Sequence, residues 1–171
     1  MRVLVTYASR HGSTAEIAER VGQVLRVVLG MHVPEVQVDV VPVAKARGIE
    51  EYDAVVIGSA IYLGRWLRPA RRFLRAESAR LRRRPVWLFS SGPVGAGPGQ
   101  GDELSELTEL FGAKDHRIFA GRLRSADLGV AERTLVRAAH AAEGDYRDWA
   151  EVTEWAGQLA DHLLASQAMA H

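Results

Sequence analysis

Five short apolar segments along the chain have the pattern of buried β-strands. They are rich in β-branched residues and end at polar or glycine-containing loops. One of them alternates between apolar and polar residues and contains Pro42, which cannot donate a ladder hydrogen bond, so we expect this strand towards a sheet edge. The predicted strands are Val3–Ala8, Val36–Val43, Ala54–Ala60, Val86–Ser91 and Arg117–Gly121.

Segments with the periodicity of an α-helix lie between most of these strands and after the last one. In residues 14–29, Ile17 and Val21 begin an apolar stripe at helical spacing, which is typical of an amphipathic helix packed on a sheet. The last helix is expected after Asp148, which together with Glu151 has the spacing of a capping box. The predicted helices cover residues 14–29, 67–83, 102–111 and 149–164.

The alternation of buried strands with helices predicts the α/β class. A parallel sheet covered on both faces and joined by right-handed crossovers gives a doubly wound, three-layer sandwich. No internal repeat or linker divides the 171 residues, so we expect one domain over residues 1–171.

One connection is much longer than the others. About 26 residues separate Gly121 from Asp148, where links of this kind usually have about 2–6, so residues 122–148 are interpreted as an insertion. From the residues alone, it is interpreted as a helical excursion at the surface. A short helix is expected there from the apolar positions Val130, Leu135, Val136 and Ala139.

Composition narrows the class of protein further. Cysteine is absent, which excludes disulfides and thiolate metal centres and agrees with a reducing compartment. The N-terminus lacks the layout of a signal peptide, and the apolar run 54–64 is too short to span a bilayer. We therefore expect a cytoplasmic protein.

The net charge of +1 hides an uneven distribution. Residues 65–84 contain nine arginines and one acid, Glu77, so this segment carries about +8 and the remainder about −7. The segment is either a solvated helix face or a patch for an anionic partner, such as a carboxylate substrate or the headgroups at the inner face of a membrane. Nucleic acid is not expected, because no nucleic-acid-binding motif is present.

The first predicted strand runs into a loop suited to a phosphate, "SRHGST", residues 9–14. It offers hydroxyl groups, successive backbone N–H groups and the N-terminus of a helix, and Gly12 allows a close turn around an anion. The alternative is that Ser13 or Thr14 only caps the helix. The loop is neither a G-x-x-x-x-G-K-S/T phosphate loop nor a G-x-G-x-x-G fingerprint, and it lacks the acids of a receiver domain.

Two further strand ends carry loops suited to a flat ring. The loop at 59–66 has Tyr62 and Trp66 around a glycine, and rings placed there could cover a heterocycle. The alternative is that one or both pack on the adjacent helix. The loop at 90–95 adds hydroxyls and close backbone approach. In open α/β sheets ligands bind beyond the carboxyl ends of the strands, so the three loops together predict a mononucleotide with a large flat head.

These loops resemble those of the flavodoxin family, which binds FMN with them. The family's phosphate loop reads Ser/Thr-x-Thr-Gly-x-Thr, and Ser9, Gly12 and Thr14 match it. His11 stands at a position where a hydroxyl is usual, so it either donates an N–H instead or is exposed. The resemblance implies a five-stranded parallel sheet in the order 2-1-3-4-5. It also implies FMN contacts from Ser9, Arg10, His11, Gly12, Ser13, Thr14, Ala60, Ile61, Tyr62, Leu63, Gly64, Trp66, Ser91, Gly92, Pro93, Val94 and Gly95.

Further segments are similar to one branch of that family, the menaquinone-dependent protoporphyrinogen dehydrogenases. They are "IGSAIYLGRWLRPARRFL" at 57–74, "IFAGRL" at 118–123, "AERTLVRA" at 131–138 and "GDYRDWAEVTEWA" at 144–156. The resemblance implies an FMN oxidoreductase that passes electrons from a small substrate to a quinone. It also implies that the insertion at 122–148 lies near the flavin, with a role towards the substrate or the quinone.

The alternatives are a flavodoxin-type electron carrier that docks on protein partners, and a domain that has lost its cofactor. Carriers of the family are typically acidic, whereas this sequence has a pI near 8.2, which favours the oxidoreductase. No protein acid, base, nucleophile or metal-site motif stands out, so FMN is expected to supply the chemistry.

Overall fold

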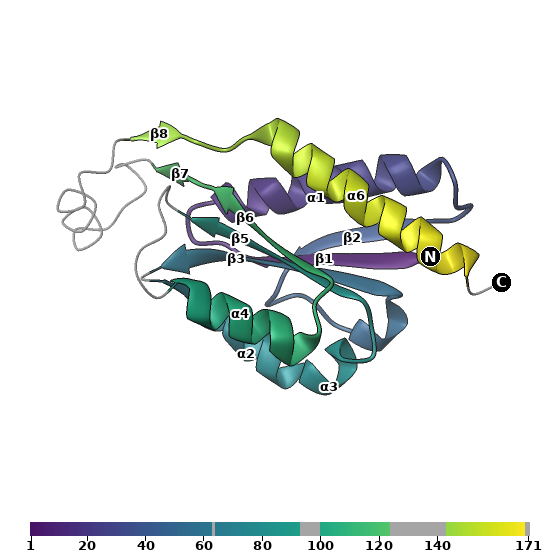
Figure 1. The fold of residues 1–171 in the computed structure, drawn as a ribbon, viewed down its shortest axis with the longest axis horizontal. Helices are drawn as coiled ribbons and strands as arrows, with labels where there is room; N and C mark the ends of the chain where they lie inside the picture. The colour runs from purple at the N-terminus through teal and green to yellow at the C-terminus, as the bar shows by residue number, and fades with distance from the viewer. Residues whose placement is uncertain (63, 93–99, 124–142, 170–171) are drawn as a thin grey trace.

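The computed structural model describes residues 1–62, 64–92, 100–123 and 143–169 (Figure 1). In these residues, strands and helices alternate along most of the chain. The elements are β1 (Arg2–Ala8), α1 (Ser13–Gly30), β2 (Gln37–Pro42), the 3-10 helix η1 (Ile49–Glu51), β3 (Ala54–Tyr62), β4 (Arg65–Trp66), α2 (Arg68–Ala76), α3 (Ser78–Leu81), β5 (Val86–Gly92), α4 (Gln100–Phe111), β6 (Asp115–Ala120), β7 (Arg122–Leu123), β8 (Gly144–Asp145) and α6 (Trp149–Ala168).

Five parallel strands form the sheet in the order β2-β1-β3-β5-β6, with β4 added antiparallel to β3. Val5 in the centre of β1 pairs with Val40 of β2 and with Val56 of β3, so the three strands are in register across their apolar middles. The doubly wound fold and the strand order 2-1-3-4-5 expected from the sequence are confirmed. The strand that contains Pro42 is an edge strand, as predicted.

Helices cover both faces of this sheet. Helices α1 and α6 lie on one face, and α2, α3 and α4 lie on the other (Figure 1). Side chains alternate between the two layers, because successive residues of a strand point to opposite faces. Val3 and Val5 belong to the cluster under α1 and α6, whereas Leu4 belongs to the cluster under α2. This two-sided burial explains why the strands read as continuous apolar runs.

The sheet centre is packed so closely that one position requires glycine. A Cβ on Gly58 of β3 would lie 2.0 Å from Cζ of Phe89 on β5. The ring of Phe89 occupies that space and contacts Phe119 and Trp155, with centroids 6.1 and 6.0 Å away. The glycine of β3 is therefore part of the aromatic packing under α6.

Helix α6 begins at a side-chain cap. Asp148 accepts hydrogen bonds from the main-chain N–H groups of Ala150 and Glu151, at 2.9 and 3.1 Å. The predicted cap at Asp148 is therefore confirmed. The carboxylate of Glu151, the expected second half of a capping box, lies 3.6 Å from Nη1 of Arg117 on β6.

Two features of the structure differ from those expected from the sequence. The helix predicted over 67–83 is two helices, α2 and α3, separated at Glu77, whose φ and ψ of −99° and 7° are not helical. The two-residue strands β4, β7 and β8 were not predicted, because two residues are too few to show a period. The helix predicted around residues 130–139 lies outside the described residues.

Across the described ranges, none of the helices combines the length and the apolar composition that crossing a bilayer requires.

Candidate functional site

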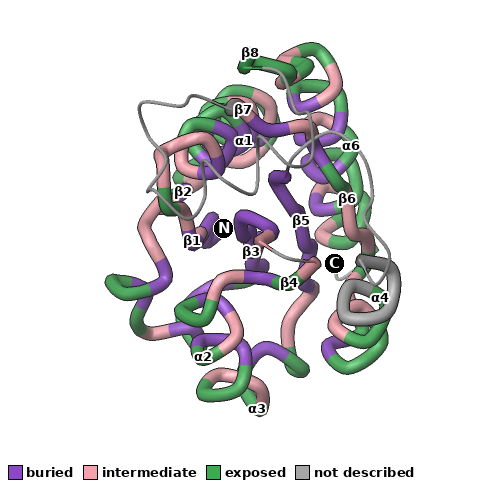
Figure 2. The backbone as a smooth tube through the Cα atoms, turned by 90° about the vertical axis from the view of Figure 1, so that its left-hand side faces the viewer, coloured by how far each residue is buried: buried purple, intermediate pink, exposed green. Residues whose placement is uncertain are grey.

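The carboxyl ends of β1, β3 and β5 lie side by side at one edge of the sheet. Ala8 pairs with Ser59, and Ala60 pairs with Ser91, so the loops that follow the three strands start next to one another. Figure 2 is viewed from the side of the molecule on which these strands end. The three loops predicted to bind a ligand are therefore brought together at the end of the sheet where such folds bind ligands.

The first loop ends in a left-handed glycine that opens α1. Gly12 has φ +86° and occupies the N-cap position, and its own N–H donates to Oγ of Ser9 at 3.1 Å. Among the described residues, no side chain caps α1, in contrast to α6, where Asp148 does so. The expectation that Ser13 or Thr14 serves only as a cap does not hold. The first amides of a helix have no intrahelical acceptor, so those of α1 can bind an anion.

The hydroxyl groups of this loop suit an anion as well. Oγ of Ser9 accepts from Gly12, and Oγ of Ser13 accepts from the main-chain N–H of Arg122 at 3.2 Å. A hydroxyl that accepts a hydrogen bond still has its own O–H to donate. Thr14 is buried, with 1% of its surface exposed, in the first turn of the helix. The loop hydroxyls can therefore donate hydrogen bonds to an anion.

His11 and Arg10 connect the first loop to the second. The imidazole of His11 and the ring of Tyr62 at the end of β3 have centroids 6.3 Å apart. The guanidinium of Arg10 lies over the same ring, 5.4 Å from its centroid. His11 is half-buried and Arg10 is exposed. Tyr62 therefore stands at the junction of the two loops, where the sequence predicts a ring contact.

The second loop is a tight reversal between β3 and β4. Tyr62 pairs with Arg65, and Gly64 adopts φ +73° in the turn between them. Ala60 and Ile61 precede the turn and are buried, with 9% and 4% of their surfaces exposed. Leu63 lies outside the described residues. The turn carries the chain from the sheet edge directly into α2.

Trp66 does not lie where a ring platform would need it. Its side chain is 1% exposed, and its indole Nε1 donates to Oγ of Ser90 at 2.8 Å in the core. The short antiparallel pairing of β3 with β4, in which Ile61 lies opposite Trp66, turns the chain back over β3 and directs the indole inward. Trp66 is therefore a packing residue, which corrects its interpretation as a cofactor-covering aromatic, and Tyr62 is the aromatic that remains for that role.

The third loop follows β5, and the structure describes its beginning only. Ser91 is 3% exposed and Gly92 is buried at the strand end. The carbonyl of Gly92 accepts from the N–H of Gly121 at 2.7 Å, and a Cβ on Gly121 would lie 3.0 Å from that oxygen. The remaining predicted contacts, Pro93, Val94 and Gly95, lie outside the described residues.

A charged cluster next to the first loop was not predicted from the sequence. Strands β7 and β8 pair as an antiparallel ribbon beyond β6, and residues at this ribbon contact the first turn of α1. Glu16 of α1 lies 3.0 Å from Nη1 of Arg122 and 2.7 Å from Nη1 of Arg147. Arg147 also binds both carboxylate oxygens of Asp145, at 2.7 and 2.5 Å.

Charge pairing in this cluster changes the titration of its acids. The hydrogen bond from Arg147 lowers the pKa of Asp145 to about 2, and the Arg147 side chain also lowers the pKa of Glu16. Both shifts favour the ionised carboxylates. No signal in the sequence pairs Arg122 and Arg147 with Glu16, which lies more than one hundred residues earlier in the chain.

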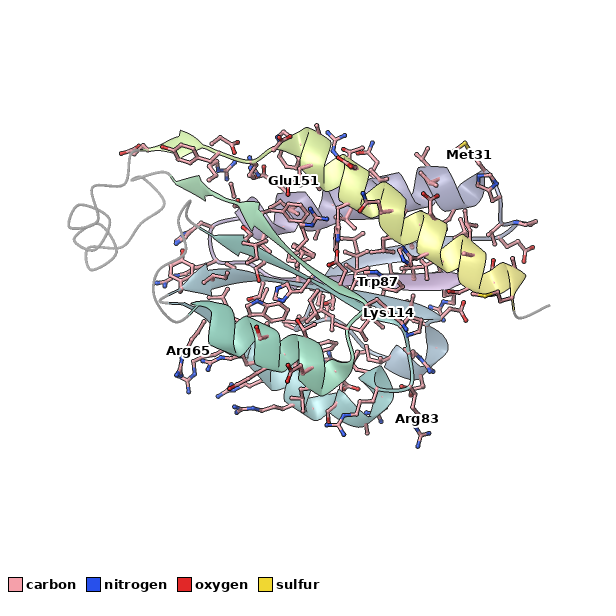
Figure 3. The ribbon with its side chains drawn as sticks, in the orientation of Figure 1. Met31, Arg65, Arg83, Trp87, Lys114 and Glu151 are labelled. Atoms are coloured by element: carbon pink, nitrogen blue, oxygen red, sulfur yellow. The ribbon has the colours of Figure 1, made fainter. Side chains whose placement is uncertain are left out.

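The arginine-rich segment divides into structural and exposed residues. Arg80 forms ion pairs with Glu50 and Glu77 at 3.2 and 3.0 Å, and Nε of Arg84 donates to the carbonyl of Ile49 at 2.9 Å. Other arginines point away from the sheet, as Arg65 and Arg83 do in Figure 3. Six are exposed and form no ion pair within the part of the chain that the structure describes: Arg65, Arg68, Arg72, Arg75, Arg82 and Arg83.

Comparison with known proteins agrees with this geometry. A family model described as a flavodoxin domain matches residues 4–149. No curated protein sequence matches the chain.

Solved structures are similar in fold. A flavodoxin from the domain Archaea superposes with a TM-score of 0.63 at 17% identity, covering 95% of this chain and 98% of that one. Flavodoxin 1 from Bacillus cereus gives 0.62 at 16% identity, with 95% and 99% covered. The rubredoxin:oxygen oxidoreductase of Desulfovibrio gigas gives 0.65 at 16% identity and covers 98% of this chain but 37% of that longer protein. At these identities the likeness shows the fold alone.

Proposed function

The chain belongs to the flavodoxin domain family, and we propose that it binds FMN at the three-loop edge and transfers electrons through it. The observation that carries this proposal is the opening of α1. Gly12 provides a left-handed turn without a side-chain cap, next to hydroxyls that have O–H groups to donate. That donor set fits a phosphate monoester.

Each part of the site has a distinct task in this proposal. Ser9, Ser13 and the first amides of α1 hold the phosphate, and Tyr62 contacts the ring at the junction of the first two loops. FMN, when bound, supplies the electron or hydride chemistry, and the protein supplies position and electrostatics. The contacts of Leu63, Pro93, Val94 and Gly95 remain predictions.

Titration of the purified apoprotein with FMN tests the proposal, with quenching of flavin fluorescence as the measurement. We expect saturable binding at micromolar concentration. A hydrogen bond to a charged group contributes about 1.5–3 kcal/mol, so Ser13→Ala should weaken FMN binding about 10- to 100-fold. Ser105→Ala, on the exposed side of α4, is the matched control and should bind like wild type. Absence of FMN binding by the wild-type protein would overturn the proposal.

A finer hypothesis is that the protein is an oxidoreductase that passes electrons from a protoporphyrinogen-like or other small substrate to a quinone. Its support is the sequence similarity of residues 57–74, 118–123, 131–138 and 144–156 to that branch of the family. The alternative is a carrier that exchanges electrons with protein partners.

Turnover separates the two hypotheses. The FMN-loaded protein is offered protoporphyrinogen and a menaquinone analogue together, and oxidation of the porphyrinogen is followed by porphyrin fluorescence. Quinone-dependent turnover supports the oxidoreductase. A flavin that can be reduced and reoxidised chemically, with no turnover of either compound, supports the carrier.

The exposed arginines support a proposal about the partner. The basic surface, defined as the six unpaired arginines of 65–83, begins at Arg65 on β4, directly after the ring loop. We propose that it contacts the anionic headgroups of a membrane. Among the described residues of 64–84 no large apolar side chain is exposed, so this contact would be electrostatic and peripheral.

A further inference from the structure

Arg122 rests on the phosphate loop through both its main chain and its side chain. Its N–H donates to Oγ of Ser13 at 3.2 Å, and its Nη2 donates to the carbonyl of His11 at 3.4 Å. A Cβ built on Gly12 would lie 3.8 Å from the same Nη2. The guanidinium is therefore in contact with the loop that opens α1, although it comes from a strand more than one hundred residues later.

Arg122 can leave its ion pair with Glu16 without leaving the Glu16 carboxylate unpaired. Glu16 receives Arg122 at 3.0 Å, but its second oxygen binds Arg147 at 2.7 Å. Arg147 is held in turn by both oxygens of Asp145, and its side chain is 3% exposed. Arg147 is thus fixed in place, while Arg122 makes the longer contacts of the two.

Charge balance favours the transfer of Arg122 to a bound phosphate. The two arginines and two carboxylates of the cluster have no formal net charge, so a phosphate monoester placed at the loop adds negative charge that nothing in the cluster offsets. The side chain of Arg122 is 14% exposed, and charge interactions are screened less at such a site than in open water. A guanidinium fork also matches the geometry of phosphate oxygens better than an ammonium does.

We propose that Arg122 is a specificity residue for the phosphate of the flavin, exchanging its contact with Glu16 for the phosphate oxygens when FMN binds. This inference rests on the proposed FMN site and adds one point to it. The ribbon after β6 contributes a cation to a phosphate site whose other donors, the hydroxyls of Ser9 and Ser13 and the first amides of α1, are neutral. The protein should therefore prefer FMN to riboflavin by more than the loop alone provides.

The test compares FMN with riboflavin, which has the same ring and no phosphate. Dissociation constants for both flavins are measured by fluorescence quenching for wild type, Arg122→Gln and Arg122→Lys. We expect Arg122→Gln to weaken FMN binding about 10- to 100-fold, as for a charged hydrogen bond, and to leave riboflavin binding unchanged. Arg122→Lys keeps the charge but loses the fork, so its FMN affinity should be intermediate.

Arg117→Gln is the matched control, because Arg117 is also paired with a glutamate, at 3.6 Å from Glu151, but belongs to the middle of β6. It should change neither affinity. Circular dichroism and thermal unfolding check that each variant is folded, and Arg122→Lys carries the test if Arg122→Gln is not.

The outcomes separate this inference from the proposed function. Equal weakening of FMN and riboflavin by Arg122→Gln would assign Arg122 a purely structural role and overturn the inference. Unchanged affinity for both would overturn it as well, while the FMN site itself would stand. A wild-type protein that binds neither flavin would overturn the proposed function and the inference together.

Discussion

Trp66 donates a hydrogen bond from its indole Nε1 to Oγ of Ser90, at 2.8 Å, inside the core between β3, β5 and α4. The hydroxyl of Ser90 also forms a hydrogen bond with Nε2 of His116 at 2.9 Å. Nδ1 of His116 in turn lies 3.3 Å from the hydroxyl of Thr108. A residue that the sequence places beside a ligand loop is thus one end of a partly buried polar chain, which reaches α4 at Thr108.

This relationship predicts that Trp66 is needed for stability and not for flavin binding. Trp66→Phe removes the N–H that Ser90 accepts, so we expect the free energy of unfolding to fall by about 1–3 kcal/mol. Urea unfolding measures the loss, and FMN titration of the same variant should match wild type. Tyr62→Leu is the converse control, because Tyr62 is half-buried at the loop and should weaken FMN binding with little loss of stability. Weaker FMN binding by Trp66→Phe at unchanged stability would contradict the prediction.

The three central strands β1, β3 and β5 could be predicted because burial on both faces produces continuous apolar runs. The phosphate loop could be predicted because its donors are consecutive in the sequence. The inward turn of Trp66 could not be predicted, since it depends on a pairing with Ile61 in a strand of two residues. The charged cluster could not be predicted either. Arg122 and Arg147 lie 106 and 131 residues from Glu16, and only the fold brings them together.

The charged cluster predicts how the thermal stability of the protein falls at acid pH. The pKa of Asp145 is lowered from its ordinary 3.8 to about 2 by Arg147, and that of Glu16 is lowered as well. Acids with lowered pKa values stabilise the fold fully above their unfolded values, and this contribution is lost as the pH falls through the folded ones. The wild-type melting temperature should therefore fall between about pH 4 and pH 2 by more than that of Asp145→Asn, measured by thermal unfolding.

Asp145→Asn should already be less stable at pH 7, because Arg147 loses the partner that binds two of its nitrogens. Its curve should then be flatter through the acid range. Two parallel curves would show that Asp145 contributes nothing through its charge.

The sheet centre predicts opposite effects of the same substitution at two glycines. In Gly58→Ala the new methyl would lie 2.0 Å from Cζ of Phe89, so we expect overpacking to cost about 1–3 kcal/mol or more. In Gly157→Ala on α6 no atom lies within 4 Å of the new methyl, and the variant should gain about 0.5–1 kcal/mol from helix propensity. Urea unfolding of both measures the contrast.

A double variant identifies the neighbour that is responsible. Gly58→Ala combined with Phe89→Leu should be less destabilised than the sum of the two single changes, because the smaller side chain gives the methyl room. Strict additivity would show that Phe89 does not set the cost.

The basic surface predicts salt-sensitive binding to anionic vesicles. Arg68, Arg72 and Arg75 lie along one exposed stripe of α2. Each arginine near an anionic bilayer contributes about 1 kcal/mol, so replacing all three by serine should weaken binding to phosphatidylglycerol vesicles about 100-fold. Vesicle co-sedimentation measures the effect, and wild-type binding should fall as salt is raised.

The matched control removes three positive charges elsewhere, at Arg20 on α1, at Lys114 just before the edge strand β6, and at Arg117 on β6. Because the change in net charge is the same, only the position of the charges differs between the two triple variants. Loss confined to the α2 variant assigns binding to this surface. Equal loss in both would show a response to net charge alone. Absence of wild-type binding to phosphatidylglycerol would mean that these arginines face only water, since no large apolar side chain exposed on α2 or α3 offers a second mode of attachment.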